Sequence, residues 1–288
     1  MKSAKIEEKI DKVLAELAKF EVLAKNERFA KIASQSVETK SALVYNFTPQ
    51  SGFITIVPLY DIHHGLKGSD TQLLDSYLEY ILDTEDCYTF LGGDSCEVAT
   101  RDSVGKAAYE EKEHVGQQRR SLTNKLRPLA CAGKILGGIS GNHEARLARF
   151  ADDDPMKEIC YDLDIPYCGY SGFLSINVND IEYHVMFHHG VGGGSTPGGA
   201  ANAASKAGKV AVADLYFSGH THRRMSYDES ICELEGDKVV KRRRLYVVGG
   251  SLVNYFDMYA EEKLLTPSVT GLVKVSLDGT IKNMSATV

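Results

Sequence analysis

The first 34 residues repeat apolar side chains at helical spacing. One series recurs at alternating intervals of four and three residues: Ile6, Ile10, Val13, Leu17 and Phe20. With Lys and Glu between its members, this series predicts a helix over residues 2–34 with one apolar face. Such a face must be covered. We interpret it as packing on the surface of the chain's own domain, and self-association through the helix is the alternative.

From about residue 51 the pattern changes to short apolar runs separated by polar segments. Six runs have the length of buried strands: 53–60, 88–91, 135–139, 183–187, 215–217 and 245–248. The stretches 72–82 and 107–126 between them are long enough for helices, so the class is α/β. Residues 268–284 predict a closing β-hairpin around Asp278-Gly279. The glycine-rich stretch 190–205 is too long for a tight turn and is interpreted as a mobile loop.

Length and composition indicate an ordinary globular protein with one core. The chain has 288 residues, of which 43% are apolar and 25% charged, and these values exclude disordered and fibrous classes. We divide it into an N-terminal helical segment, residues 1–45, and one domain, residues 46–288. Six cysteines include no C-x-x-C pair, and no signal peptide is recognisable, so we expect reduced thiols and a cytoplasmic location.

Charge and hydropathy limit the kinds of partner that we expect for this chain. No stretch approaches the 18 or so consecutive apolar residues of a spanning helix, so no membrane role is expected. The formal net charge of −6 argues against general affinity for nucleic acid. Short basic clusters nevertheless occur at 119–120, 223–224 and 241–244, and the second of them directly follows a motif of interest.

Five of the apolar runs are followed by residue types that bind metals. In order along the chain, the segments are Asp61-Ile62-His63, Gly92-Gly93-Asp94, Gly141-Asn142-His143-Glu144, His188-His189-Gly190 and Gly219-His220-Thr221-His222. They contain most of the histidines, whereas caps and turns alone would not concentrate histidine there. Because strand ends in an open α/β sheet meet at one edge, we expect these side chains to share one cleft.

The mixture of donors indicates the kind of metal. Imidazole nitrogen together with carboxylate oxygen favours manganese, iron, zinc, cobalt or nickel over calcium or magnesium. Seven groups are available when one histidine of the 188–189 pair is counted, and they can serve two ions if one carboxylate bridges them. Four positive charges against two aspartates leave an excess that suits an anionic substrate and a bridging hydroxide. Two such ions can hold the attacking and leaving oxygens of a displacement at phosphorus.

The order D-x-H, G-D, G-N-H-E, H-G, G-H-x-H resembles the calcineurin-like metallophosphoesterase superfamily, from about residue 51 to the C-terminus. The resemblance implies a four-layer α/β/β/α sandwich with a two-metal site at the strand ends, manganese being the first choice of ion. It implies that one ion is bound by Asp61, His63 and His222, and the other by Asn142, His189 and His220. Asp94 would bridge the two ions.

The resemblance also implies roles for two residues that are not ligands. His143 would lie beside the leaving oxygen and donate a proton or stabilise its charge. Glu144 would orient His143 or a neighbouring loop. Strand alternation alone leaves His188 and His189 open as the fourth-motif ligand, and His189 is preferred because family members commonly place the ligand directly before glycine.

The expected function is hydrolysis of phosphate esters by attack of a metal-bridged hydroxide on phosphorus. Phosphodiesters, as nucleic acid or nucleotide, are the favoured substrates, and small phosphomonoesters are the alternative. Arg146, Arg223 and Arg224 could meet substrate phosphate or form ordinary surface ion pairs. The second motif lacks the V-D-R-G continuation of serine/threonine protein phosphatases, which weakens that assignment. A non-catalytic binding protein on the same fold would be expected to lack ligands, and none is missing from this set.

Overall fold

The computed structural model describes residues 2–34, 39–99, 111–192, 196–256 and 258–288. The chain consists of two compact units, Met1–Ser41 and Ala42–Val288. The first contains one long helix, α1 (Lys2–Ser34), and the second contains all the strands that the described residues form. Among the helices of these residues, none is both long and apolar enough to cross a membrane.

The helix predicted at the N-terminus is present, and its apolar side chains are exposed. Ile10, Val13, Leu17 and Phe20 are between 51% and 67% exposed. Burial of an apolar face supplies most of the stability of protein helices. Within its own unit, no other helix or strand of the described residues covers this face. Of the two interpretations of the pattern, packing on the chain's own domain and self-association, we propose the second.

Deletion of residues 1–41 is expected to lower the number of chains per particle, because it removes these exposed apolar residues. Gel filtration with light scattering measures that number directly. The full-length variant Leu17→Glu, which places a charge on the apolar face, should dissociate in the same way. A truncated protein with the oligomeric state of the full chain would remove self-association from consideration.

Two β-sheets form the frame of the second unit. Among the described residues, the larger sheet has the order β1-β5-β6-β7-β9-β10, with β8 paired to β9, and the smaller has the order β12-β11-β2-β3-β4. The larger sheet contains β1 (Leu43–Phe47), β5 (Ser171–Val178), β6 (Ile181–His188), β7 (Leu215–Ser218), β8 (Arg224–Glu235), β9 (Lys238–Ser251) and β10 (Gly271–Leu272). The smaller contains β2 (Phe53–Ile56), β3 (Cys87–Leu91), β4 (Ile135–Gly138), β11 (Lys274–Asp278) and β12 (Met284–Thr287).

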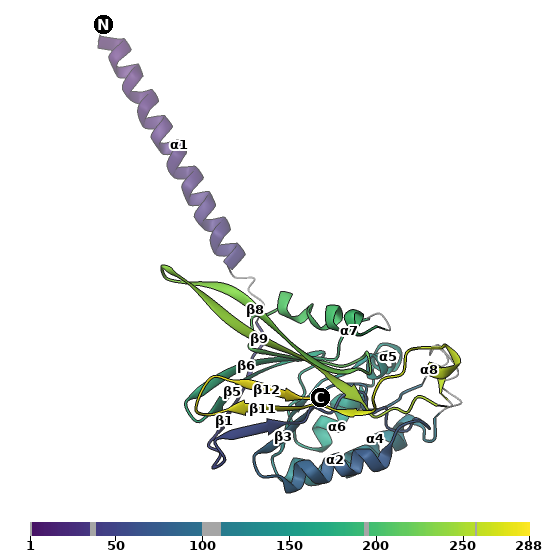
Figure 1. Cartoon of the computed structure of the whole chain (residues 1–288). Helices are drawn as coiled ribbons and strands as arrows, with labels where there is room; N and C mark the ends of the chain where they lie inside the picture. The colour runs from purple at the N-terminus through teal and green to yellow at the C-terminus, as the bar shows by residue number, and fades with distance from the viewer. Residues whose placement is uncertain (1, 35–38, 100–110, 193–195, 257) are drawn as a thin grey trace. The chain divides into compact units, whose positions relative to one another are not determined.

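Helices lie on the outer faces of both sheets (Figure 1). Among the described residues, the helices of the second unit are α2 (Thr71–Asp83), α4 (Val115–Cys131), α5 (Asn142–Ala151), α6 (Pro155–Asp162), α7 (Pro197–Ala204), the 3₁₀ turn η1 (Ala207–Lys209) and α8 (Tyr259–Glu262). One apolar cluster, which includes Ile54 and Phe217, fills the space between the sheets. A second cluster packs α2, α4 and α6 on the smaller sheet, and α7 packs on the larger. The predicted four-layer α/β/β/α sandwich is therefore confirmed.

The direction of the strands determines where their ends meet. The neighbours β2, β3 and β4 are parallel, and so are β6, β7 and β9. The carboxyl ends of parallel strands lie at one edge of a sheet. The two edges are joined at Asp61, whose main-chain oxygen accepts hydrogen bonds from Leu252 N (3.2 Å) and Ser251 Oγ (3.0 Å) at the end of β9. The segments that follow these strands are thereby brought to one place.

Most predicted elements are present with shifted ends. Each of the six apolar runs overlaps a strand. The predicted closing hairpin is formed by β11 and β12. The helix predicted at 72–82 is α2, which begins after Asp70, whose side chain accepts a hydrogen bond from Leu73 N. The helix predicted at 107–126 corresponds to α4, which extends to Cys131, and residues 107–110 lie outside the described residues.

The interpretation of residues 190–205 as a loop was wrong for half of the stretch. Residues 197–204 form α7, and residues 193–195 lie outside the described residues. Thr196 caps this helix by accepting a hydrogen bond from Gly199 N (3.2 Å), and Pro197 occupies the first turn. A side-chain cap, a proline at the start and four alanines outweigh the two glycines of this segment.

Candidate metal centre

The five strand-end segments meet at one site. Asp61 and His63 follow β2, Asp94 follows β3, Asn142 begins α5 after β4, His189 follows β6, and His220 and His222 follow β7. Six of the seven predicted ligand residues fall into two adjoining groups of side chains, and the seventh, Asp94, lies between them. The shared cleft that the sequence predicts corresponds to these contacts between side chains.

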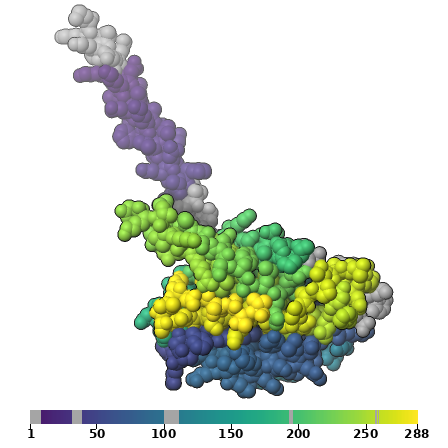
Figure 2. Space-filling model, in the orientation of Figure 1, coloured from purple at the N-terminus to yellow at the C-terminus, as the bar shows by residue number. Residues whose placement is uncertain are grey.

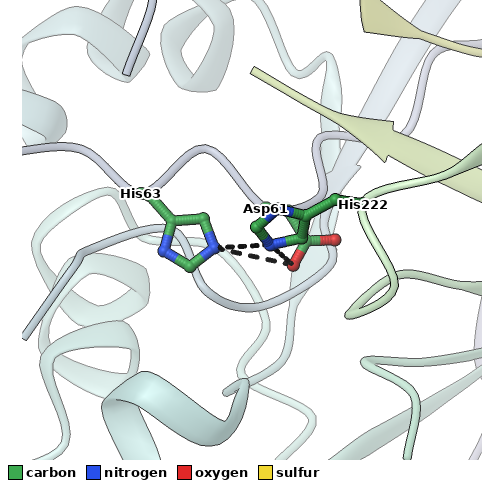
Figure 3. Close-up of side chains that lie close together, drawn as sticks. All are labelled: Asp61, His63 and His222. Carbon is green, nitrogen blue, oxygen red and sulfur yellow. Dashed lines mark hydrogen bonds and ion pairs between the residues drawn. The ribbon is translucent and has the colours of Figure 1, made fainter. Parts of the chain in front are cut away.

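The first group contains Asp61, His63 and His222, whose donor atoms all lie within 4.8 Å of one another (Figure 3). The two Nε2 atoms of the histidines are 3.1 Å apart, and Asp61 Oδ1 lies 3.8 Å from that of His63 and 3.5 Å from that of His222. Asp61 is fully buried, and its Oδ1 has no hydrogen-bond partner within the described residues. Because an unpaired buried oxygen is costly, this arrangement fits a bound cation.

The second group contains Asn142, His189 and His220. Asn142 Oδ1 lies 3.1 Å from His189 Nε2 and 2.7 Å from His220 Nδ1. The other ring nitrogen of His189, Nδ1, is 3.1 Å from the main-chain oxygen of Gly92. Donation of the Nδ1 proton to that oxygen leaves the Nε2 lone pair directed at the group, as metal-binding histidines require.

Asp94 contacts both groups. Its Oδ2 is 3.1 Å from His189 Nε2 in the second group and 3.9 Å from His63 Nε2 in the first. Its Oδ1 accepts a hydrogen bond from His143 N (2.8 Å). A buried carboxylate between two sets of donors has the position that a bridging ligand needs. Nitrogen and oxygen donors in these numbers fit divalent transition ions.

The structure separates the two neighbouring histidines of the fourth segment. His189 faces Asp94 and Asn142, whereas His188 Nδ1 accepts a hydrogen bond from Gly190 N (2.8 Å) outside both groups. Successive residues at the end of a strand point to opposite sides, so only one of the pair can face the site. The geometry favours the residue directly before the glycine.

Electrostatics keep Asp94 ionised and His222 neutral, which are the forms that bind metal, whereas His189 is held in its protonated form. Burial alone would raise the pKa of Asp94, but the His189 and His143 imidazoles hold it well below its usual range. Burial lowers the pKa of His222 to about 4, so its ring is neutral at neutral pH. The Asp94 carboxylate overcomes burial at His189 and raises the pKa of that imidazole to about 9. His189 must therefore lose a proton when it binds a cation.

The backbone at this site adopts an unfavourable conformation. Five of the seven residues have positive φ: Asp61 (47°), His63 (48°), Asp94 (48°), His220 (67°) and His222 (54°). A non-glycine residue in this region is uncommon and costs of order 1–3 kcal/mol when held there by its surroundings. Strain of this kind gathers at functional sites, and here it re-aims side chains that a regular strand would have directed elsewhere.

The sequence prediction missed Glu97 altogether. Its Oε2 lies 2.7 Å from His63 Nδ1, and its Oε1 lies 3.5 Å from His143 Nδ1. The main-chain oxygen of Glu97 also pairs with His143 Nδ1. Glu97 thus orients two imidazoles of the site through their outer nitrogens. Its only signal in the sequence was an acidic residue three positions after Asp94.

Glu144 supports the loop that carries Asp94. Its carboxylate accepts hydrogen bonds from four main-chain N–H groups, those of Asp94 (3.0 Å), Ser95 (2.7 Å), Cys96 (3.0 Å) and Gly141 (2.9 Å). Burial and the nearby Asp94 charge raise the pKa of Glu144 to about 7. Of the two roles considered for this residue, the contacts match the support of a neighbouring loop.

Replacement of Glu144 by Ala is expected to lower the free energy of unfolding by about 3 kcal/mol or more. The reason is that several buried N–H groups would lose their acceptor, at about 1–3 kcal/mol each. Urea unfolding followed by circular dichroism measures the change. Glu144→Gln, which keeps one oxygen acceptor, should fall between the wild type and Ala. The exposed Glu158→Ala is the matched control, and equal stability of the two Ala variants would contradict this role for Glu144.

Comparison with known proteins adds little to this geometry. No protein-family model matches the chain, and no curated protein sequence matches it. A solved structure from Streptococcus pneumoniae, described as a conserved uncharacterized protein and predicted phosphoesterase, is similar with 13% identity and a TM-score of 0.35, covering 81% of this chain and 88% of that one. A double mutant of Vps29 from Entamoeba histolytica has 14% identity and a TM-score of 0.35, covering 82% and 98%. Likenesses this low establish no shared activity.

Proposed function

We propose that the chain is a phosphoesterase that uses two divalent metal ions. The observation that carries this proposal is that two groups of buried or half-buried nitrogen and oxygen donors each have an imidazole nitrogen within 3.9 Å of the Asp94 carboxylate. Asp61, His63 and His222 would hold one ion. Asn142, His189 and His220 would hold the other. Manganese is the ion we propose first, with iron, zinc, cobalt and nickel as alternatives of the same ligand preference.

Two divalent ions, when bound, lower the pKa of a coordinated water and neutralise charge on phosphate oxygens. The side chains of the site contribute the remaining requirements. Asp61 and Asp94 remain ionised, because neighbouring imidazoles lower the pKa of both. Their buried position excludes water from the side of the site that faces the core. With two divalent ions bound, four positive charges would face the two negative charges of these carboxylates. The excess of positive charge suits an anionic ester.

His143 is the proton donor in this proposal. Its Nε2 lies 3.7 Å from Asp94 Oδ2, and its Nδ1 pairs with the main-chain oxygen of Glu97. The Nδ1 proton stays on that hydrogen bond while Nε2 delivers a proton to the leaving oxygen. Burial lowers the pKa of His143, so its protonated ring is a stronger acid than a free imidazolium. A positioned acid of this kind contributes typically 10²–10⁴-fold to a rate.

Removal of metal tests the proposal. Dialysis against a chelator is expected to abolish hydrolysis of p-nitrophenyl phosphate and bis-p-nitrophenyl phosphate, and Mn²⁺ should restore it as two ions bind per chain. Metal content by mass spectrometry and rates by absorbance are the measurements. Addition of Mg²⁺ or Ca²⁺ is the control, because both prefer sites made of oxygen alone. A chain that binds no ion, and cleaves no ester with any of the five transition ions, would instead be a binding protein on this fold.

A further inference from the structure

The candidate metal centre opens into one cavity, and a second cavity adjoins it. The first has a volume of about 310 Å³ and is lined by the proposed ligands His63, Asp94 and Asn142 together with His143 and Arg146, and we name it the His143 cavity. The other has a volume of about 340 Å³ and is lined by Arg223, Asn254, Tyr255, Thr266 and Ser268, and we name it the Tyr255 cavity. Both are also lined by His220 and His222, so they adjoin at the site itself.

One segment of the chain lines both cavities. It contributes Val253, Ala260 and Leu265 to the walls of each. These residues lie in the connection between β9 and β10, which contains α8 and reaches the surface (Figure 2). A phosphorus atom held at the metal centre would therefore lie in the His143 cavity with the Tyr255 cavity beside it at His220 and His222, and each cavity has room for an organic substituent.

On this basis, and given the function proposed above, we propose that the substrate is a phosphodiester with a nucleoside as its retained substituent. A monoester has one substituent, which a single cavity accommodates, and it would leave the second cavity filled by solvent alone. A diester fills both. The class of the substrate thus follows from the presence of a second cavity beside the one that holds the reacting atom.

The position of His143 indicates which of the two substituents of the diester leaves. His143 lines one cavity and not the other, so the leaving oxygen points into the His143 cavity and its substituent departs there. Water gives one proton to solvent as its oxygen forms a bond to phosphorus, and the bond from phosphorus to the leaving oxygen breaks. The leaving oxygen takes a proton from His143 Nε2, and solvent returns a proton to His143. The products are an alcohol and a phosphomonoester, and the monoester keeps the substituent in the Tyr255 cavity.

The walls of the Tyr255 cavity suit a nucleoside. Tyr255 offers a half-buried aromatic face, Asn254 an amide, Thr266 and Ser268 hydroxyl groups, and Arg223 a cation. A nucleobase stacks on an aromatic side chain, and sugar and base edges pair with amide and hydroxyl groups. Combined in one cavity beside a phosphate site, these groups match a planar base with a hydroxylated sugar.

The experiment compares Tyr255→Ala with wild type on two chromogenic esters in Mn²⁺. The p-nitrophenyl ester of thymidine 5′-monophosphate is the diester, and p-nitrophenyl phosphate is the monoester. The ratio of kcat/KM for the diester to that for the monoester is expected to fall about tenfold or more in Tyr255→Ala, mainly through KM, because a stacking partner is lost. The control is Tyr161→Ala, since Tyr161 is 83% exposed and lines neither cavity. It should leave the ratio within about twofold.

Different results overturn the two proposals. An unchanged ratio in Tyr255→Ala, or a wild type that prefers the monoester, would overturn the nucleoside diester while leaving a phosphoesterase. Absence of hydrolysis of both esters, with every transition ion supplied, would overturn the phosphoesterase itself. A fall in the ratio confined to Tyr255→Ala supports both.

Discussion

Asp94→Asn is expected to lose both bound metal and hydrolysis, each by more than about a hundredfold, since even changes outside the ligand shell cost 10–100-fold. The substitution removes the negative charge from a buried side chain that lies within 3.9 Å of nitrogen donors in both groups. The amide oxygen of Asn can still accept the hydrogen bond from His143 N, so the fold should be retained. Metal per chain after gel filtration and kcat/KM on a chromogenic diester are the measurements.

The control for this experiment is an aspartate outside the site. Asp75 pairs with Lys125 on the surface (2.6 Å), and Asp75→Asn should keep both metal and activity. Thermal unfolding of both variants separates loss of the site from loss of the fold. Undiminished hydrolysis in Asp94→Asn would refute the assignment of Asp94 as a shared ligand, and with it the two-ion proposal.

His143→Ala is expected to lower kcat by about 10²–10⁴-fold while metal stays bound. The residue lies beside the two groups but belongs to neither proposed ligand set. A proton donor matters most when the leaving group is a poor one. The loss should therefore be smallest for p-nitrophenyl esters and larger for alkyl esters, whose alkoxides need the proton.

The matched control is the exposed His184→Ala on β6, which removes an imidazole far from the cluster without touching the site. Steady-state kinetics on a series of esters with different leaving groups, together with metal content, make the comparison. An equal loss for all leaving groups, or a parallel loss of metal, would show that His143 acts as a ligand or a structural residue.

The clustering of the site followed from the sequence because strand ends are a local property. Short apolar runs mark strands, the polar residues after them mark strand ends, and parallel strands share one edge. This reasoning predicts Asp61, Asp94 and His220 as residues of the site. It missed the β8–β9 hairpin, because β8 is exposed along much of its length and shows no apolar run.

The local sequence pattern could not show which residues far apart in the chain contact one another at the site. Glu97 and Glu144 are two acidic residues among many in the sequence, and only the packing of α5 against the Asp94 loop gives Glu144 three of its four N–H donors. In the same way His188 and His189 are equivalent by composition. Their different surroundings depend on β6 lying beside β7 in the larger sheet.

The sequence by itself determined the class of the fold, the order of the strand ends and the kinds of donor that follow them, because each depends on neighbours within a few residues. The tertiary structure alone decided that Asp94 lies between two groups of donors, that Glu97 orients two imidazoles, and that two cavities adjoin at the site. These features join segments as far apart as Asp61 and Tyr255. Contacts over that separation are set by the packing of two sheets against each other, which no local pattern encodes.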